Sequence, residues 1–355
     1  MRRRFLIALA IYSLAHLYIW WRLVLPLPSP AWQIATGIVA LFAPSFPINM
    51  RIRRRLMREM ARPWLLVSFI WFGCIIYLLL GALASHLAVA FGANAREAAE
   101  IGAATSLAVV AAGLLNVARG PVIKRVRVPL ARLPVVSYTI AHLTDVHVGP
   151  LIGRPFIQRL VERVNSLQPD LIVITGDLID GPLSELRDHI EPMRGLRARD
   201  GVFAVTGNHE YYWNVEPWLQ HLRTLGMRVL RNEHVTIDGA FQLAGVDDAS
   251  FGEDVARAVE SRDPEKPLVL LAHHPRTVAR AKDAGVDLQL SGHTHGGQLL
   301  PWGWLARIWD PRVAGLARFG RTWLYVSHGT GFWGPPMRVG TRCEIAAITL
   351  VPASD

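Results

Sequence analysis

Hydrophobic positions divide the chain into two parts with different patterns. The first third contains long apolar runs at residues 5–25, 31–48, 64–89 and 101–117. Since about 20 apolar residues cross a bilayer as a helix, these runs predict an N-terminal transmembrane region of four spans over residues 1–120. From residue 135 the pattern changes to short β-rich runs separated by amphipathic stretches, which indicates an α/β domain over 135–355. The basic residues between them, 121–134, are predicted to form a juxtamembrane linker.

Two of the apolar runs have alternative interpretations. The first follows Arg2–Arg4 and resembles a signal peptide, but it continues through Trp20 and Trp21 without a small-residue cleavage site. We therefore predict that it is a retained span, with the tryptophans at the membrane interface. The second run contains Pro44 and Pro47. If that run were re-entrant, the C-terminal domain would face the outer side of the membrane.

Basic residues lie beside the apolar runs. The formal net charge is +10, and six arginines fall within residues 51–62, between the second and third runs. Basic segments also precede the first run and follow the fourth, whereas the other two loops contain few basic residues. Because cytoplasmic loops carry an excess of Lys and Arg, this distribution predicts four spans with the C-terminal domain in the cytoplasm. Topology accounts for the charge, so no specific nucleic-acid binding is predicted.

The cysteines exclude two classes of structure. Cys74 lies in the third apolar run and Cys343 near the C-terminus, so neither a disulfide framework nor a thiolate metal site is expected. A metal site in this chain would use oxygen and nitrogen ligands.

Side chains that bind metals follow the predicted strands of the C-terminal domain. Ligand sites in α/β sheets form at the carboxyl ends of strands, where successive loops converge. A single Asp or His there is more often a cap or turn residue, but five such strand ends predict a metal site. A helical stretch, 155–167, separates the first two strands. The strands and the residues that follow them are 135–143 with Asp145 and His147, 170–175 with Asp177 and Asp180, 201–205 with Asn208 and His209, 267–272 with His273 and His274, and 286–290 with His293 and His295.

The ordered motifs resemble those of the calcineurin-like metallophosphoesterase superfamily. They are D-x-H from Asp145, GDxxD from Gly176, GNHE from Gly207, H-x-P from His273 and GHTH from Gly292. The resemblance covers roughly residues 135–352, and each motif is present without substitution. It implies two packed sheets flanked by helices. The preceding spans and the GHTHGGQ sequence are most similar to membrane-associated metallophosphoesterases of bacteria, which implies a multi-pass protein of the bacterial inner membrane.

The resemblance also implies two divalent metal ions. A ligand set without thiolate suits Mn, Fe or Zn. A shared carboxylate can hold two ions roughly 3.5–4 Å apart, and a hydroxide between them is the expected nucleophile. The implied ligands are Asp145, His147 and His295 for one ion, Asn208, His273 and His293 for the other, and Asp177 for both.

Three further residues are candidates for roles beside the metals. The resemblance gives His209 the role of protonating the leaving oxygen or stabilising the transition-state charge. Asp180 could orient a ligand, as carboxylates behind metal ligands do, or could cap a helix. His273 is assigned to the metal because it begins the H-x-P motif, which leaves His274 as a supporting or structural residue.

Substrate contacts have weaker signals in the sequence. Aromatic residues at 302, 304, 309, 332 and 333 follow the last motif and could seat an acyl chain, although core positions would explain them equally well. Arg307, Arg312, Arg318 and Arg338 could bind phosphate oxygens or lie on the surface. The Gly329–Gly331 turn could bring backbone close to metal or phosphate.

These observations lead to one leading function and two alternatives. The leading prediction is a membrane-anchored phosphoesterase that acts on a phosphate ester or pyrophosphate. A lipid-linked substrate is the hypothesis that the membrane tether motivates. The alternatives are a broad phosphomonoesterase or phosphodiesterase for soluble substrates, and a membrane sensor or transport protein with a regulatory metal domain. The sequence does not indicate the oligomeric state.

Overall fold

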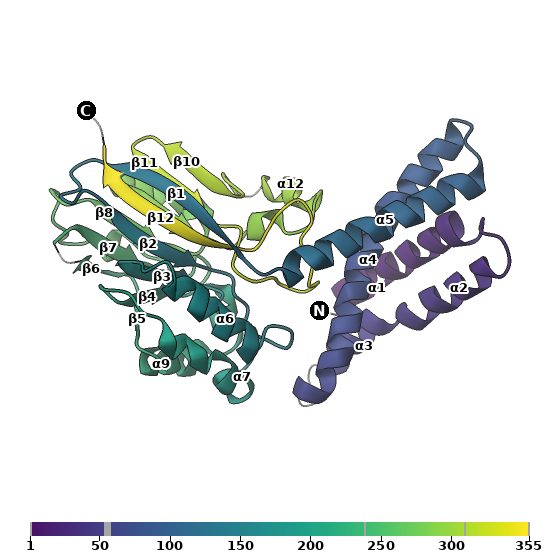
Figure 1. Cartoon of the computed structure of the whole chain (residues 1–355), viewed down its shortest axis with the longest axis horizontal. Helices are drawn as coiled ribbons and strands as arrows, with labels where there is room; N and C mark the ends of the chain where they lie inside the picture. Colours follow the sequence, from purple (N-terminus) through teal and green to yellow (C-terminus); the bar gives the residue numbers. More distant parts are fainter. Residues whose placement is uncertain (1, 53–57, 238, 309, 354–355) are drawn as a thin grey trace. The chain divides into compact units, whose positions relative to one another are not determined.

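The computed structural model describes residues 2–52, 58–237, 239–308 and 310–353 (Figure 1). The chain divides into a helical unit, Met1–Arg119 with Gly334–Val339, and a second unit, Gly120–Trp333 with Gly340–Asp355. Residues 334–339 were expected in the soluble domain, but they belong to the helical unit. Arg53, Arg54, Arg55 and Trp309, which the sequence analysis used, lie outside the described residues.

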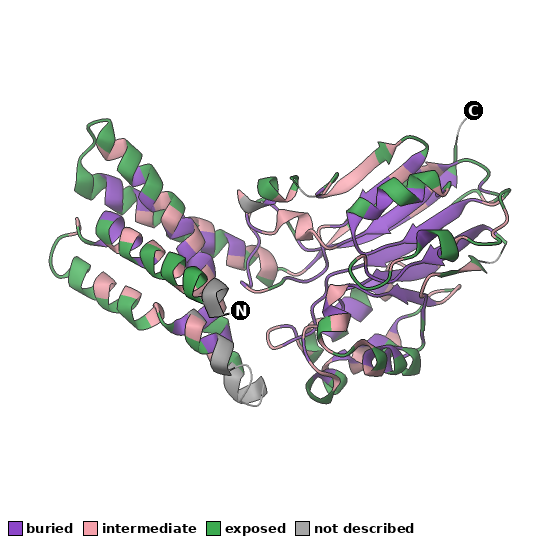
Figure 2. Cartoon of the chain, turned by 180° about the vertical axis from the view of Figure 1, so that it is seen from behind, coloured by how far each residue is buried: buried purple, intermediate pink, exposed green. Residues whose placement is uncertain are grey.

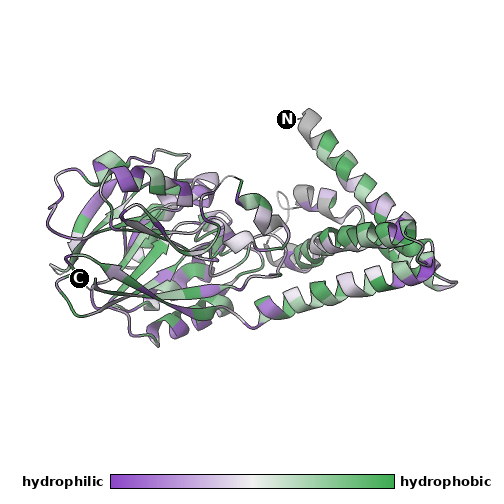
Figure 3. Ribbon diagram, turned by 90° about the horizontal axis from the view of Figure 1, so that it is seen from above, coloured by the Kyte–Doolittle hydropathy of each residue, from purple (hydrophilic) through white to green (hydrophobic). Residues whose placement is uncertain are grey.

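Apolar helices form the helical unit. Its stretches Leu6–Val24, Ala31–Asn49, Arg62–Ala90 and Ala95–Ala118 are long and apolar enough to cross a membrane. Large apolar side chains such as Leu14, Ile34 and Leu87 are exposed on these helices. The helices carry many residues coloured as exposed in Figure 2 and are coloured as largely hydrophobic in Figure 3. The prediction of a membrane protein with about four spans is therefore confirmed. The helices are α1 (Arg2–Ile19), continued by a π-helical turn (Trp20–Val24), α2 (Ala31–Phe42), α3 (Ser45–Ile52), α4 (Arg58–Ala90) and α5 (Ala95–Ala118).

The segment Gly334–Val339 is fixed to α5 by its backbone. The N–H of Arg338 donates to the carbonyl of Gly113 at 3.1 Å, and Asn116 Nδ2 donates to the carbonyl of Arg338 at 2.9 Å. A side chain on Gly73 of α4 would overlap Met337, so the glycine allows this segment to pack closely. Arg338 is thus a buried residue of the helical unit and not a surface arginine.

Two six-stranded sheets form the second unit (Figure 1). Their strands are mostly parallel, which confirms the predicted two-sheet architecture flanked by helices. The first sheet has the order β1 (Val122–Leu130), β12 (Glu344–Pro352), β2 (Tyr138–Leu143), β3 (Leu171–Thr175), β4 (Val202–Val205), β5 (Met227–Val229). The second has the order β10 (Gly315–Phe319), β11 (Thr322–Val326), β9 (Leu288–Ser291), β8 (Leu268–Leu271), β7 (Phe241–Gly245), β6 (Glu233–Ile237).

The basic segment after α5 is a strand, which corrects the expected linker over 121–134. Residues 122–130 form β1, which pairs in parallel with β12 from Val122–Glu344 to Leu130–Pro352. Side chains alternate between the two faces of an extended backbone, so a strand can bury one face and expose the other. Val128 and Leu130 are buried, whereas Arg125 and Arg127 are exposed. The basic residues lie on the exposed face, so the charge of this segment did not indicate a strand that buries its other face.

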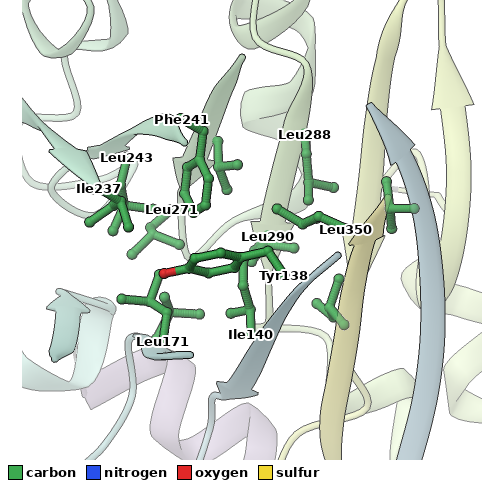
Figure 4. Close-up of a cluster of buried hydrophobic side chains, with 14 of the residues drawn as sticks. Tyr138, Ile140, Leu171, Ile237, Phe241, Leu243, Leu271, Leu288, Leu290 and Leu350 are labelled. Atoms are coloured by element: carbon green, nitrogen blue, oxygen red, sulfur yellow. The ribbon is translucent and has the colours of Figure 1, made fainter. Parts of the chain in front are cut away.

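The core lies between the two sheets. Tyr138 and Leu171 of the first sheet pack with Phe241, Leu271 and Leu290 of the second (Figure 4). Helices cover the outer faces; α10 and α11, for example, bury apolar side chains against β7 and β8. The helices are α6 (Arg154–Asn165), α7 (Leu183–Ile190), α8 (Asn208–Tyr212), α9 (Val215–Thr224), α10 (Val255–Ala258), α11 (Val278–Asp283) and α12 (Trp302–Ala306).

Parallel pairing sets where the candidate ligands gather. Strands β2, β3 and β4 are parallel neighbours, so their carboxyl ends meet at one edge of the first sheet. The same holds for β7, β8 and β9 in the second sheet. The loops that follow β2, β3, β4, β8 and β9 carry the predicted metal ligands.

Candidate metal centre

Backbone hydrogen bonds hold the ligand loops in register beyond the strand ends. The N–H of Asp145 donates to the carbonyl of Gly176, and the N–H of His147 donates to that of Asp177, both at 3.1 Å. On the other side, the N–H of Gly331 donates to the carbonyl of Asp145 at 3.0 Å. The loop after β2 therefore lies between the loop after β3 and the Gly329–Gly331 turn.

Five predicted ligands have left-handed backbone conformations. Non-glycine residues rarely adopt a positive φ, and each such residue costs about 1–3 kcal/mol unless its surroundings hold it. These five residues all belong to the predicted metal site. Strained backbone is concentrated at functional sites in proteins. The φ values are 50° for Asp145, 52° for His147, 50° for Asp177, 69° for His293 and 51° for His295.

Gly292 allows the two sheets to approach each other at the site. A Cβ at this position would overlap Thr144 and the carboxylate of Asp145. Without a side chain, the backbone passes close enough for the N–H of His293 to donate to both carboxylate oxygens of Asp145, at 3.0 and 3.1 Å. The hydroxyl of Thr144 donates to the same carboxylate at 2.8 Å. The glycine of the GHTH motif therefore fixes a candidate ligand from the opposite sheet.

The candidate ligands form two groups. In the first, His295 Nε2 lies 3.0 Å from His147 Nε2 and 3.4 Å from Asp145 Oδ1. In the second, His273 Nε2 lies 3.3 Å from both His293 Nδ1 and Asp177 Oδ2. Asp177 is also 3.9 Å from His147 Nε2. The ligand atoms of Asp145, His147 and His295 are close enough to hold one metal ion, and those of Asp145, Asp177 and His273 are close enough to hold another.

Asn208 supplies an oxygen with no other partner. Its Oδ1 atom is buried and accepts no hydrogen bond from the residues that the structure describes. A buried carbonyl oxygen without a donor is costly, because it has lost its hydrogen bonds to water. A metal ion would compensate that loss, so the orphaned oxygen fits the ligand role that the motif predicts.

The protonation of the imidazoles also fits a metal. Burial lowers the pKa of His147 to about 4 and that of His293 to about 2, so both rings are neutral, which is the form that coordinates metals. His273 Nδ1 donates to the carbonyl of Thr175 at 2.7 Å, which directs Nε2 towards the site. Although burial opposes it, Asp177 raises the pKa of His273 to about 10, so this carboxylate favours positive charge at that position.

Oxygen and nitrogen donors without thiolate therefore surround the site, and its buried carboxylates face imidazoles. Burial raises the pKa of Asp145 to about 6, which reflects the cost of an anion away from water. A divalent cation would offset this cost. The residues present fit a pair of divalent metal ions.

Comparisons with known proteins agree with this geometry. Residues 138–297 match the family model of the calcineurin-like phosphoesterases. An uncharacterized metallophosphoesterase of Campylobacter jejuni is 36% identical over 252 residues, which are 69% of this chain and 67% of that protein. The chain belongs to the calcineurin-like metallophosphoesterase family. The resemblance predicted from the motifs is confirmed.

Two further proteins are similar to part of this chain. A bovine "transmembrane protein with metallophosphoesterase domain" is 42% identical over 281 residues, which are 73% of this chain and 63% of that protein. This chain thus spans less than two thirds of the bovine relative's length. A dimetal phosphatase from Danio rerio is a solved structure with a TM-score of 0.37 and 11% identity, covering 61% of this chain and 99% of that chain.

In this metallophosphoesterase, His209 lies at the site beside Asp180. His209 Nε2 is 3.9 Å from Asp177 Oδ2, and its Nδ1 is 3.2 Å from Asp180 Oδ1. Trp213 Nε1 donates to the same oxygen of Asp180 at 3.2 Å. Asp180 therefore contacts His209 directly. A nitrogen of His209 is also close enough to Asp177 and His147 to share a metal with them.

His274, predicted as a supporting or structural residue, lies beside the second ligand group. Its ring centroid lies 3.8 Å from that of His293, and its Nε2 lies 3.0 Å from Asp248 Oδ2. His274, His273 and His293 together could hold an ion. The loop after β7 thus brings Asp248 beside the second ligand group.

Glu210 supports the site, although the sequence did not single it out. Its buried carboxylate accepts the N–H groups of Gly207 at 2.7 Å, Asp177 at 3.0 Å and Leu178 at 2.8 Å. It thereby joins the loops that carry Asn208 and Asp177. Its place in the GNHE motif was the available signal.

The predicted substrate contacts divide into two sets. Arg312 donates to the carbonyl of Ala314, and Arg318 lies over the ring of Trp323. By contrast, an aromatic group, which we define as Tyr212, Phe251 and Trp333, is exposed beside His209. The ring centroids of Tyr212 and Trp333 lie 5.3 and 6.0 Å from that of His209.

Proposed function

We propose that this chain is a membrane-anchored phosphoesterase that uses two divalent metal ions to hydrolyse a phosphate ester or pyrophosphate bond. The observation that carries the proposal is the position of Asp177. It groups with His147 and His209 on one side and with Asp145 and His273 on the other. A carboxylate shared between two sets of ligands is what a pair of metal ions acting on one phosphate requires.

Two sets of residues in this chain would each hold one metal ion. Asp145, His147 and His295 would hold one ion, Asn208, His273 and His293 the other, and Asp177 both. The nitrogen and oxygen donors suit Mn, Fe or Zn. Bound there, the ions would supply Lewis acidity that polarises the phosphoryl group and lowers the pKa of water.

His209 would act on the leaving group. Its ring is largely buried, and the carboxylate of Asp180 at Nδ1 fixes its orientation. Burial opposes protonation, but Asp180 and Asp177 raise the pKa of His209 above its ordinary value. A protonated ring beside the site can donate its proton to the leaving oxygen as the phosphorus–oxygen bond breaks.

The aromatic group supports a lipid-linked substrate. Tyr212, Phe251 and Trp333 expose apolar surface beside His209, where the leaving group would lie. Trp333 is held by Gln298, whose side chain bonds its carbonyl at 2.9 Å and its N–H at 3.1 Å. An apolar chain on the substrate would cover this surface.

The arginines of residues 51–62 support a cytoplasmic catalytic domain, since short basic loops remain on the cytoplasmic side. A C-terminal epitope tag tested for protease access from each side of the membrane would decide this. Cleavage from the outer side in intact cells would contradict the assignment.

The test of the function uses the full chain purified in detergent. After loading with Mn, Zn, Fe or Mg, its metal content is measured, and its hydrolysis of aryl phosphate monoesters, diesters and lipid pyrophosphates is compared. We expect two ions per chain and metal-dependent hydrolysis. A metal-loaded protein that hydrolyses none of these compounds would contradict the proposal.

A second comparison tests the lipid-linked substrate. Trp333→Ala and Phe251→Ala should raise KM for a lipid pyrophosphate and leave KM for a small aryl phosphate unchanged. Val136→Ala, at an exposed apolar residue ahead of β2, is the control. Equal activity of the wild-type protein on lipid-linked and soluble esters would favour the broad phosphoesterase instead.

A further inference from the structure

A buried carboxylate outside the predicted ligand set holds one more histidine at the site. Glu344, at the start of β12, is 2% exposed. Its Oε1 accepts the hydroxyl of Tyr325 at 2.5 Å and the N–H of His328 at 3.2 Å, and its Oε2 accepts His328 Nδ1 at 2.8 Å. Two of these three contacts come from His328, so the carboxylate fixes both the backbone and the ring of that residue.

The ring of His328 lies against the GHTH turn. A Cβ on Gly296 would overlap Cδ2 of His328, the ring atom next to Nε2. Gly296 has a φ of 60° and directly follows the candidate ligand His295. The imidazole of His328 therefore lies against the backbone that directly follows His295, a member of the first ligand group.

The backbone after His328 confirms that its segment runs along the centre. The N–H of Thr330 donates to the carbonyl of Thr144 at 2.8 Å, and the N–H of Gly331 donates to that of Asp145 at 3.0 Å. His328 thus begins a turn held against the loop of Asp145, and its ring touches the turn of His295.

Nε2 is the part of His328 that remains available. The side chain is 32% exposed, whereas that of Glu344 is 3% exposed. Among the residues that the structure describes, Nε2 has no hydrogen-bond partner. With Nδ1 bonded to Glu344, the ring presents Nε2 to a ligand. Both nitrogens of an imidazolium are donors, and a hydrogen bond from a charged ring to an anion is stronger than one between neutral groups.

We propose that His328, oriented by Glu344, donates a hydrogen bond from Nε2 to a phosphoryl oxygen of the substrate at the metal centre. His328 is therefore a substrate-binding residue, and Glu344 is the residue that positions it. This inference rests on the proposed phosphoesterase function, but it concerns phosphate binding rather than the bond-breaking step.

The test measures binding of inorganic phosphate by calorimetry to the metal-loaded full chain. A hydrogen bond to a charged group is worth about 1.5–3 kcal/mol, so His328→Ala should weaken phosphate binding about 10- to 100-fold. KM for a phosphate ester should rise by a similar factor, with a smaller change in kcat. His328→Gln, whose amide can donate a hydrogen bond, should recover part of the affinity. Glu344→Gln should change both quantities in the same direction as His328→Ala.

Metal content and a distant histidine serve as controls. His328→Ala should retain both ions, and His234→Ala, whose ring bonds the carbonyl of Ala258, should match the wild type. The inference is overturned if His328→Ala binds phosphate within about twofold of the wild type, or if it loses metal to the same extent as affinity. If His328 proves necessary for phosphate binding but the wild type hydrolyses no ester, the inference stands and the proposed function fails.

Discussion

The carboxylate of Glu210 accepts the backbone N–H of Asp177 at 3.0 Å, which ties the GNHE motif to the residue that the two ligand groups share. The same side chain accepts the N–H groups of Leu178 and Gly207 at 2.8 and 2.7 Å. Two loops from neighbouring parallel strands therefore share one acceptor. Since Asp177 has a left-handed backbone, this carboxylate also holds a conformation that would otherwise be unfavourable.

Glu210→Gln should weaken metal binding and activity together. The amide has one acceptor oxygen in place of two, and its NH₂ group would face backbone donors. Loss of such a supporting contact typically costs about 10- to 100-fold in metal affinity or activity. Metal content at limiting metal and kcat/KM would measure the effect. Glu216→Gln, at an exposed residue paired with Arg231, is the control, and equal behaviour of the two variants would contradict the role.

His209→Ala should separate catalysis from metal binding. If His209 protonates the leaving oxygen, its loss should lower kcat by about 10²–10⁴-fold while both ions remain bound. Asp180→Asn should lower kcat less, since the amide can still contact Nδ1. Metal analysis and steady-state kinetics on the same samples would check this. A variant that keeps full turnover removes the acid role, and one that loses an ion makes His209 a ligand.

His293→Ala and His295→Ala should damage different ions. His293 Nδ1 faces His273, whereas His295 Nε2 faces His147, although only Thr294 separates the two residues in the chain. Each variant should retain about one ion per chain in place of the two that a dinuclear centre holds. The retained ion should differ between the variants in its coordination, as X-ray absorption spectroscopy would show. Loss of both ions in each variant would argue that the two sites form only together.

Acid should destabilise the second unit through Glu344. Burial alone would raise the pKa of Glu344, but the hydrogen bonds from His328 and Tyr325 lower it to about 2, below its ordinary value of 4.5. Because the folded pKa is depressed, the stabilisation is complete above about pH 4.5 and is lost as the pH falls towards 2. The titratable groups that face the carboxylate are His328, Tyr325 and, through its charge, His142.

Hydrogen exchange of β12 against pH would test this prediction. Protection in the wild type should fall between about pH 4.5 and 2, whereas Glu344→Gln should lose this part of the pH dependence. Glu233→Gln, at an exposed residue of β6, should behave as the wild type. An unchanged acid profile in Glu344→Gln would show that other carboxylates control the loss of stability.

Much of the fold was predictable because its signals are local. Apolar runs predicted the membrane helices, and short β-rich runs predicted β2, β3, β4, β8 and β9 to within a few residues. Strand β1 was not predicted, since its basic residues occupy the exposed face and only its partner β12, more than 200 positions later, buries the other. The assignment of Gly334–Val339 to the helical unit was not predicted for the same reason, because the contacts of this segment are with α4 and α5, which are distant in the sequence.

The sequence by itself determined the kinds of metal-binding side chains, their order and the family to which they belong. It could do so because motif residues follow strand ends directly, and parallel strands bring those ends together. Only the tertiary structure decided which side chains face each other. It grouped His147 with His295 and His273 with His293, joined Asp180 to His209 and Asp248 to His274, and placed His328 against Gly296. These pairs come from loops far apart in the chain, and their contacts depend on sheet packing and left-handed backbone conformations that no local pattern encodes.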